Sequence, residues 1–132
     1  MPDLQRAKRR NFVAKRSIAR DCRAQRSQCA GFLPCDWQAH VAEMTDLAAD
    51  ERAEIMNAVY RVEAAMRQVF RPAKINLASL GNVVPHLHWH VIARFDNDAN
   101  FPAPIWAPAQ RKATMTVADD WPQQVKKLLE AV

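Results

Sequence analysis

The chain has no apolar run that approaches the roughly 18 residues of a membrane-spanning helix, so we expect no membrane attachment. Its 132 residues include only three cysteines, Cys22, Cys29 and Cys35, and their spacing is not the C-x-x-C of a metal site. An odd number of cysteines argues against a disulfide framework and favours a reducing compartment such as the cytoplasm. The first residues lack the apolar core of a secretory signal, and no repeat or low-complexity tract marks a second folded domain. These absences predict a single cytoplasmic domain.

The chain has no excess of basic charge outside its N-terminal quarter. Residues 1–36 hold nine Lys and Arg against three Asp and Glu, whereas residues 37–132 hold ten against eleven. The formal net charge of +5 therefore comes from the N-terminal segment alone. A nearly neutral body gives no electrostatic reason to expect a nucleic-acid partner.

Residues 1–36 show no helical or strand period, so we treat them as a divergent basic segment before a folded domain at residues 37–132. Three interpretations fit such a segment: a disordered arm, a nucleic-acid contact, and an Arg-rich mitochondrial presequence. We favour the disordered arm, because no pattern of interleaved aromatic residues marks a base-stacking surface.

Two helices are predicted in the folded domain. Apolar residues at spacings of three and four predict an amphipathic helix from about Thr45 to Phe70, and Pro72 disfavours its continuation. Asp120 is placed to cap a last helix near Pro122. The apolar stripe of this last helix consists of Trp121, Val125, Leu128, Leu129 and Val132.

Three histidines at alternate positions, His86, His88 and His90, are the most informative feature of the chain. The residues between them are apolar, and this strict alternation predicts a β-strand that continues to Arg94. Successive side chains of a strand point to opposite faces, so we expect all three imidazoles on one face, roughly 6.5–7 Å apart. A second strand is predicted at residues 74–80, joined to the first by a hairpin loop at residues 79–82. Helices combined with an antiparallel sheet give the α+β class.

The run His-apolar-His-apolar-His-apolar-apolar at residues 86–92 resembles the motif of the histidine-triad (HIT) superfamily. Residues 76–85, Asn-Leu-Ala-Ser-Leu-Gly-Asn-Val-Val-Pro, look like the strand and loop that precede the triad in this family. His40 matches its upstream histidine, and the resemblance covers about residues 37–108. It implies a HIT-like antiparallel sheet that carries the triad, with a long helix packed against it.

The resemblance also implies a function. HIT proteins are nucleotide hydrolases and nucleotidyl transferases that act on the α-phosphate of nucleoside phosphoramidates, dinucleoside polyphosphates and related compounds, and they are commonly homodimers. From it we expect a nucleotide substrate with an adenine base, a homodimer and no cofactor.

The resemblance assigns roles to individual residues. His88 would be the nucleophile that forms a nucleotidyl-histidine intermediate, with a backbone carbonyl accepting its Nδ1–H and leaving Nε2 free. His90 would contact the phosphate and take part in protonating the leaving group, and His86 would support the row. The expected substrate-binding residues are His40, Asn76, Asn82 and Val84.

Other interpretations of these residues stay open. Three histidines can bind Zn²⁺, but ligands on one strand converge poorly on a metal that needs Zn–N distances of about 2.0–2.1 Å, so we expect no metal. His40 alone is equally well explained as a structural histidine, and Asn76 as an ordinary strand residue. A non-catalytic nucleotide-binding or interaction protein with an incomplete pocket is the main alternative function, and a metal-dependent enzyme is a third.

The chain departs from the family pattern at three positions near the motif. Asn82 stands where many members have Gln, Val83 where many have a hydroxyl residue, and Ala93 where Pro is usual. These changes leave the nucleophile in place and bear on the leaving-group chemistry and the favoured substrate.

Residues 1–36 do not resemble the strands that family members place before the upstream histidine. Codons that fit residues 31–36, read one base later, encode the β-prone segment Ala-Ser-Cys-Arg-Val-Ile at the place of a family strand. We hypothesise that a one-base change put this region out of frame. That hypothesis predicts N-terminal strands that are missing or divergent, an incomplete base pocket and weakened activity.

Overall fold

The histidine-rich segment forms the middle strand of the sheet in the computed structural model, which describes residues 32–36 and 40–130. The described sheet has the strand order β1-β3-β2, with β1 at Phe32–Asp36, β2 at Lys74–Ala78 and β3 at His88–Arg94. Both outer strands pair with β3 in antiparallel orientation. The predicted pairing of β2 with β3 and the α+β class are confirmed.

Strand β1 lies inside the segment that the sequence placed before the folded domain. Its register runs from Phe32 opposite Ile92 to Asp36 opposite His88. A strand therefore forms at residues 32–36, so the disordered-arm interpretation is wrong for these residues, whereas the out-of-frame hypothesis stays a prediction. Pro34 and Asp36 are poor strand residues, and pairing with β3 outweighs their local preference. The disordered-arm and out-of-frame interpretations otherwise concern residues 1–31, which lie outside the described residues.

The long helix starts later than its sequence pattern predicts. Residues Met44–Asp46 form a single 3₁₀ turn, η1, in which the Asp46 carboxylate accepts the backbone N–H of Glu43 at 3.0 Å. Helix α3 then spans Ala49–Phe70, and the Glu51 carboxylate accepts the backbone N–H of Ala48 at 3.0 Å. Asp46 and Glu51 thus cap two separate elements, η1 and α3, instead of a single helix.

The end of α3 lies where the sequence predicts it. Arg71 follows the helix with φ 47°, in the left-handed region, and its N–H donates to the carbonyl of Arg67 at 3.0 Å. Pro72 comes next, where it cannot continue the helix. This tight stop turns the chain directly into β2.

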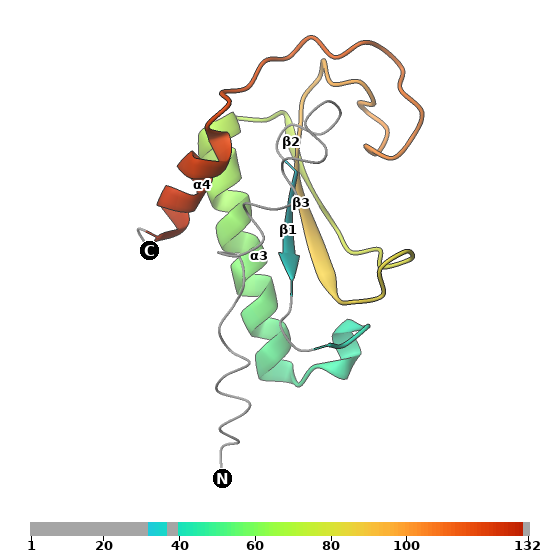
Figure 1. Cartoon of the computed structure of the whole chain (residues 1–132), viewed down its shortest axis with the longest axis vertical. Coiled ribbons are helices and arrows are strands. Elements are labelled where there is room, and N and C mark those ends of the chain that lie inside the picture. The colour runs from blue at the N-terminus through green and yellow to red at the C-terminus, as the bar shows by residue number, and fades with distance from the viewer. Residues whose placement is uncertain (1–31, 37–39, 131–132) are drawn as a thin grey trace.

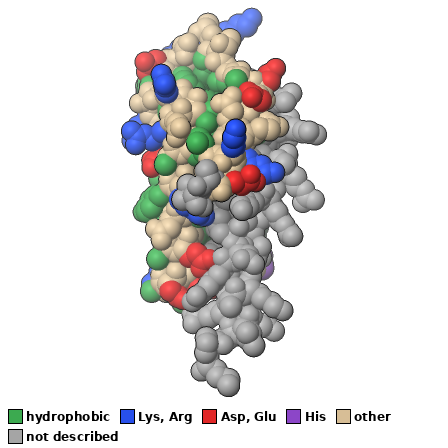
Figure 2. Space-filling view, turned by 90° about the vertical axis from the view of Figure 1, so that its left-hand side faces the viewer, with side chains coloured by type: hydrophobic (Ala, Val, Ile, Leu, Met, Phe, Trp, Pro, Cys, Tyr) green, Lys and Arg blue, Asp and Glu red, His purple; other side chains and the backbone are tan. Residues whose placement is uncertain are grey.

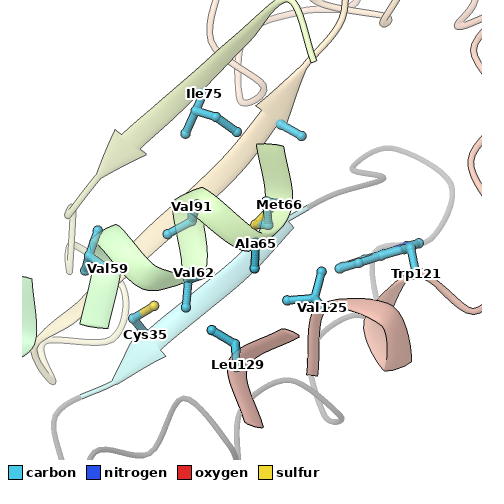
Figure 3. Close-up of a cluster of buried hydrophobic side chains, with 11 residues drawn as sticks. Cys35, Val59, Val62, Ala65, Met66, Ile75, Val91, Trp121, Val125 and Leu129 are labelled. Atoms are coloured by element: carbon cyan, nitrogen blue, oxygen red, sulfur yellow. The ribbon is translucent and has the colours of Figure 1, made fainter. Parts of the chain in front are cut away.

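The core lies between α3 and one face of the sheet. Figure 3 shows Cys35 of β1, Ile75 of β2 and Val91 of β3 facing the helix, which supplies Val59 and Met66. Residues directly opposite on paired strands share a face, so the even-numbered residues of β3 lie on the other side. We call that side the histidine face. It carries His88, His90, Ile92 and Arg94 of β3 and Lys74, Asn76 and Ala78 of β2.

Helix α4, Trp121–Glu130, packs against the outer side of α3 (Figure 1). Its buried residues Trp121, Val125 and Leu129 belong to the predicted apolar stripe and join the same core. The Trp121 ring also lies 5.0 Å from the ring of Phe70, centroid to centroid. Both described helices therefore lie on one side of the sheet, whereas the loop after β3 contacts Arg94 on the histidine face.

Neither charge dominates the described residues on the side of the molecule that carries α3 and α4. Acidic, basic and hydrophobic side chains are interspersed over the described residues visible in Figure 2. This agrees with the near-neutral balance of residues 37–132.

Among the described helices, none combines the length and the apolar character needed to cross a membrane.

Candidate active site

His88 and His90 lie side by side on the histidine face. They are the first and third residues of β3, so alternation along the strand points both rings the same way, as predicted. Their ring centroids are 4.8 Å apart and the ring planes meet at 81°, so that the edge of one ring faces the other. Both side chains are half-buried.

A backbone carbonyl orients the His88 ring. Nδ1 of His88 lies 2.5 Å from the carbonyl oxygen of His86. A carbonyl oxygen can only accept, so the proton of a neutral His88 ring resides on Nδ1 and Nε2 carries a lone pair. The hydroxyl of Ser79 donates to the backbone carbonyl of His88 at 2.7 Å, which ties the start of β3 to the residue after β2. The strand end and the ring are thus both held in place.

The prediction that all three histidines belong to one strand is wrong at His86. Strand β3 begins only at His88, because Pro85 has no N–H for a strand ladder and Leu87 N–H donates instead to the Val41 carbonyl at 2.7 Å. The His86 ring stacks on His40, with centroids 5.7 Å apart and planes inclined by 13°. The structure therefore brings the four histidines together as two ring pairs, linked through the His86 carbonyl.

The connection from β2 to β3 is longer than the predicted hairpin loop. It spans residues 79–87, since β2 ends at Ala78. Gly81 adopts φ 70°, a conformation that favours glycine, and begins the turn. Asn82 and Val84, two of the expected substrate-binding residues, are exposed on this connection. Val84 exposes 57% of its surface, so it is available for contact with a ligand.

Asn76 lies on β2 and contacts a residue that the sequence pattern does not assign to the site. Its Oδ1 accepts a hydrogen bond from Nη1 of Arg94 at 2.9 Å. Arg94 also binds Asp98 through two bonds, Nε to Oδ2 at 3.0 Å and Nη2 to Oδ1 at 3.1 Å. The i, i+4 spacing of Arg94 and Asp98 was visible in the sequence, but nothing local shows that both are buried.

Asp98 organises the loop after β3. Its carboxylate also accepts the backbone N–H groups of Phe95, Asn100 and Phe101 at 3.0, 3.0 and 2.7 Å. Burial acts to raise the pKa of Asp98, but the hydrogen bonds from Arg94 and these backbone groups outweigh it and lower the pKa from 3.8 to about 2. The carboxylate is therefore ionised throughout the neutral range.

A hollow of about 600 Å³ runs beside the outer edge of β2. Its walls come from β2, from Glu63 of α3 and from the loop that contains Pro102, Pro104 and Trp106. Asn76 and Arg94 also line it, whereas the four histidines are not among its lining residues. Within residues 32–36 and 40–130, no three His, Cys, Asp or Glu side chains converge as metal ligands.

Comparison with known proteins identifies the family to which this arrangement belongs. The family model described as "HIT domain" matches residues 9–97, which is more than half of the chain. The chain belongs to the HIT domain family. No curated protein matches it significantly.

Crystal structures of other HIT proteins share the fold. The chain is 32% identical to a histidine triad protein from Bradyrhizobium japonicum, with a TM-score of 0.61 over 76% of this chain and 73% of that one. A HIT protein from Sinorhizobium meliloti 1021 is 28% identical, with a TM-score of 0.60 over 76% and 74% of the two chains. A histidine triad protein from Marinobacter aquaeolei VT8, at 24% identity, shows the same fold with a TM-score of 0.58 over 76% and 72%.

The HIT match begins further upstream than the sequence resemblance. It starts at residue 9, inside the basic segment, whereas the resemblance was recognised only from about residue 37. Strand β1 falls within the added stretch and supplies a HIT-like sheet strand at residues 32–36. Membership of the HIT family supports a nucleotide-binding or hydrolase role.

Proposed function

We propose that this HIT protein is a nucleotide hydrolase or nucleotidyl transferase in which Nε2 of His88 attacks the α-phosphorus of a nucleoside phosphoramidate or dinucleoside polyphosphate. The observation that carries the proposal is the hydrogen bond between Nδ1 of His88 and the His86 carbonyl at 2.5 Å. It keeps the nucleophilic lone pair on the ring nitrogen that the carbonyl does not engage.

The reaction proceeds in two displacements. In the first, a bond forms between Nε2 of His88 and the α-phosphorus, and the bond from phosphorus to the leaving nitrogen or oxygen breaks. The leaving group departs with the electron pair and takes up a proton, for which His90 is the adjacent donor, its ring centroid 4.8 Å from that of His88. In the second, water or another acceptor attacks phosphorus and gives its proton to His90, and the P–N bond breaks with its electron pair returning to Nε2 of His88.

The remaining site residues have supporting roles in this proposal. The stacked rings of His40 and His86 hold the segment whose carbonyl orients His88. The amides of Asn76 and Asn82 are the proposed donors to phosphate or ribose, and Val84 is the proposed apolar contact for the nucleoside. Two displacements through a covalent intermediate predict ping-pong kinetics.

Trapping the intermediate tests the proposal. The full chain is incubated with adenosine 5′-phosphoramidate or a diadenosine polyphosphate, quenched during turnover and analysed by peptide mass mapping. We expect an adenylyl group on the peptide that contains His88 in the wild type and none in His88→Ala, which also loses turnover. Turnover that survives His88→Ala would contradict the proposal.

A non-catalytic nucleotide-binding protein is the second candidate, and one feature favours it. Val83 is 93% exposed at the position where many HIT proteins have a hydroxyl residue, so no side-chain proton donor stands there. AMP binding without turnover of either substrate, in the protein with an intact triad, would support this candidate over the enzyme.

We also propose a homodimer with an adenine nucleotide as its substrate and the cytoplasm as its compartment. The position of β2 supports a dimer through this strand, because it is an edge of the described sheet, and Leu77 and Trp106 beside it are 36% and 55% exposed. Tyr60 of α3, one turn before Glu63 of the β2 hollow, adds a third exposed apolar side chain at 51%. The adenine base follows from the family resemblance, and the reducing compartment from the cysteine pattern.

A further inference from the structure

Arg94 is a buried charged side chain on the histidine face that the proposed reaction does not use directly. The residue is 2% exposed, and its Nε and Nη2 donate to the two carboxylate oxygens of Asp98. Nη2 also donates to the carbonyl of Ala103 at 2.6 Å. These contacts hold the guanidinium plane on the side of the loop and turn Nη1 toward Oδ1 of Asn76, 2.9 Å away.

The contact with Arg94 determines which way the amide of Asn76 is turned. A guanidinium has only donors, so the amide oxygen has to face Arg94 and the amide nitrogen has to point away from it. Asn76 lies opposite Ile92 in the register of β2 and β3. Arg94 and His90 are the neighbours of Ile92 on this face, one toward each end of the strand. An amide whose oxygen points to the Arg94 end presents its two N–H groups toward the His90 end.

We propose that Arg94 is a positioning residue that holds Asn76 as a hydrogen-bond donor to the phosphate or ribose of a nucleotide at His88 and His90. The inference rests on the proposed function and adds a reason why Asn76 can bind an anion. Without Arg94 the amide is free to rotate and to present its oxygen, which repels phosphate. Asp98, in the loop after β3, contributes by holding Arg94 in place. The loop therefore affects the orientation of Asn76 through Arg94.

Side-chain NMR signals of the full ¹⁵N-labelled chain provide the first test, with AMP as the probe. The NH₂ signals of Asn76 are identified by their absence in Asn76→Asp, and we expect AMP to shift them in the wild type. In Arg94→Met we expect the Kd for AMP to rise about tenfold or more, with loss of the Asn76 shift. The matched control is Arg111→Met, which removes donors to the carbonyls of Asp98 and Phe101 in the same loop and leaves the Asn76 contact in place. We expect this control to keep the wild-type Kd and the wild-type Asn76 shift.

Asn76→Asp provides a second test that does not disturb Arg94. The carboxylate keeps an oxygen facing the guanidinium but replaces the NH₂ group by a second acceptor. We expect the unfolding midpoint to be retained and AMP binding to weaken about tenfold or more. Adenosine, which lacks the phosphate, should discriminate less between Asn76→Asp and the wild type.

The outcomes separate this inference from the proposed function. AMP that shifts the Asn76 signals equally in Arg94→Met and the wild type would overturn the positioning role, and so would wild-type AMP binding by Asn76→Asp. Either result would leave His88 as the proposed nucleophile. AMP that shifts no signal of β3 in the wild type would overturn both proposals. If Arg94→Met does not fold, the affinity of Asn76→Asp decides the question.

Discussion

At the scale of single residues, His86 acts on the proposed nucleophile through its backbone. The carbonyl of His86 accepts the Nδ1 proton of His88, whereas the His86 ring stacks on His40. Replacing the side chain leaves the carbonyl in place. The ring and the carbonyl of His86 therefore have separable roles, which the alternating pattern of three histidines did not indicate.

We expect His86→Ala to lower kcat by less than about 100-fold, compared with at least about 1,000-fold for His88→Ala, because only the second change removes the proposed nucleophile. Steady-state hydrolysis of adenosine 5′-phosphoramidate measures both. The variant His40→Ala is the matched control, since the two rings form one stack. The double variant should be no slower than the slower of its two single variants. A loss in His86→Ala as large as that in His88→Ala would contradict the separation of roles.

Several residues of the site were predictable because their signals are local. Alternation predicts that His88 and His90 share a face, and a turn signal at residues 81–82 predicts a paired strand that carries Asn76. Arg94 and Asp98 were missed because their importance comes from burial, which depends on a loop folding back over the strand. Only the structure shows that Arg94 joins this loop to Asn76.

At the scale of helices and strands, the length of the sequence pattern determines how well an element can be predicted. The helix pattern gave the end of α3 correctly and its start three or four residues too early, since residues 44–46 form a separate turn. The short strand β1 carried no usable pattern, because Pro34 and Asp36 interrupt it and its partner lies more than 50 residues away. Strands of this kind are specified by their neighbours.

The loop after β3 is an element whose stability should depend on pH. The pKa of Asp98 is lowered from 3.8 to about 2 in the folded chain, so its ionised form stabilises the fold. This contribution is fully present above about pH 4 and is lost as the pH falls toward about 2, and the shift corresponds to about 2 kcal/mol. Urea unfolding of the wild type and of Asp98→Asn, at about pH 6, 4 and 2.5, measures it.

The comparison isolates Asp98 because the other carboxylates titrate in both proteins. We expect the wild type to be the more stable at about pH 6, and the difference in unfolding free energy to shrink as the pH falls. A difference that stays constant across the range would show that the charge of Asp98 does not stabilise the loop.

At the scale of the whole molecule, the sequence separated a basic N-terminal part from a near-neutral body, and the boundary of the fold does not follow that division. Strand β1 ends at Asp36, the last residue of the basic part, and pairs along five residues of β3. Charge reports on partners and solubility and does not mark where a fold begins. The match to the HIT domain begins at residue 9, within the basic part, so it does not follow the charge division either.

The outer edge of β2 yields a prediction about assembly. An edge strand offers unpaired backbone groups, and the exposed side chains of Tyr60, Leu77 and Trp106 lie on the elements that line the adjacent hollow or flank it. A second copy pairing antiparallel along β2 would cover both the backbone and these side chains. We expect size-exclusion chromatography with light scattering to give a dimer for the wild type and a monomer for Leu77→Lys, whose charge would lie in the interface.

The control for this prediction is Gln123→Lys, which adds the same charge to an exposed position of α4 on the helical side of the molecule. It should remain a dimer, because the proposed interface does not include α4. A Leu77→Lys variant that also remains a dimer would place the interface elsewhere. A wild type that is monomeric at every concentration measured would exclude the assembly, and each histidine face would then have to bind its nucleotide without a second subunit.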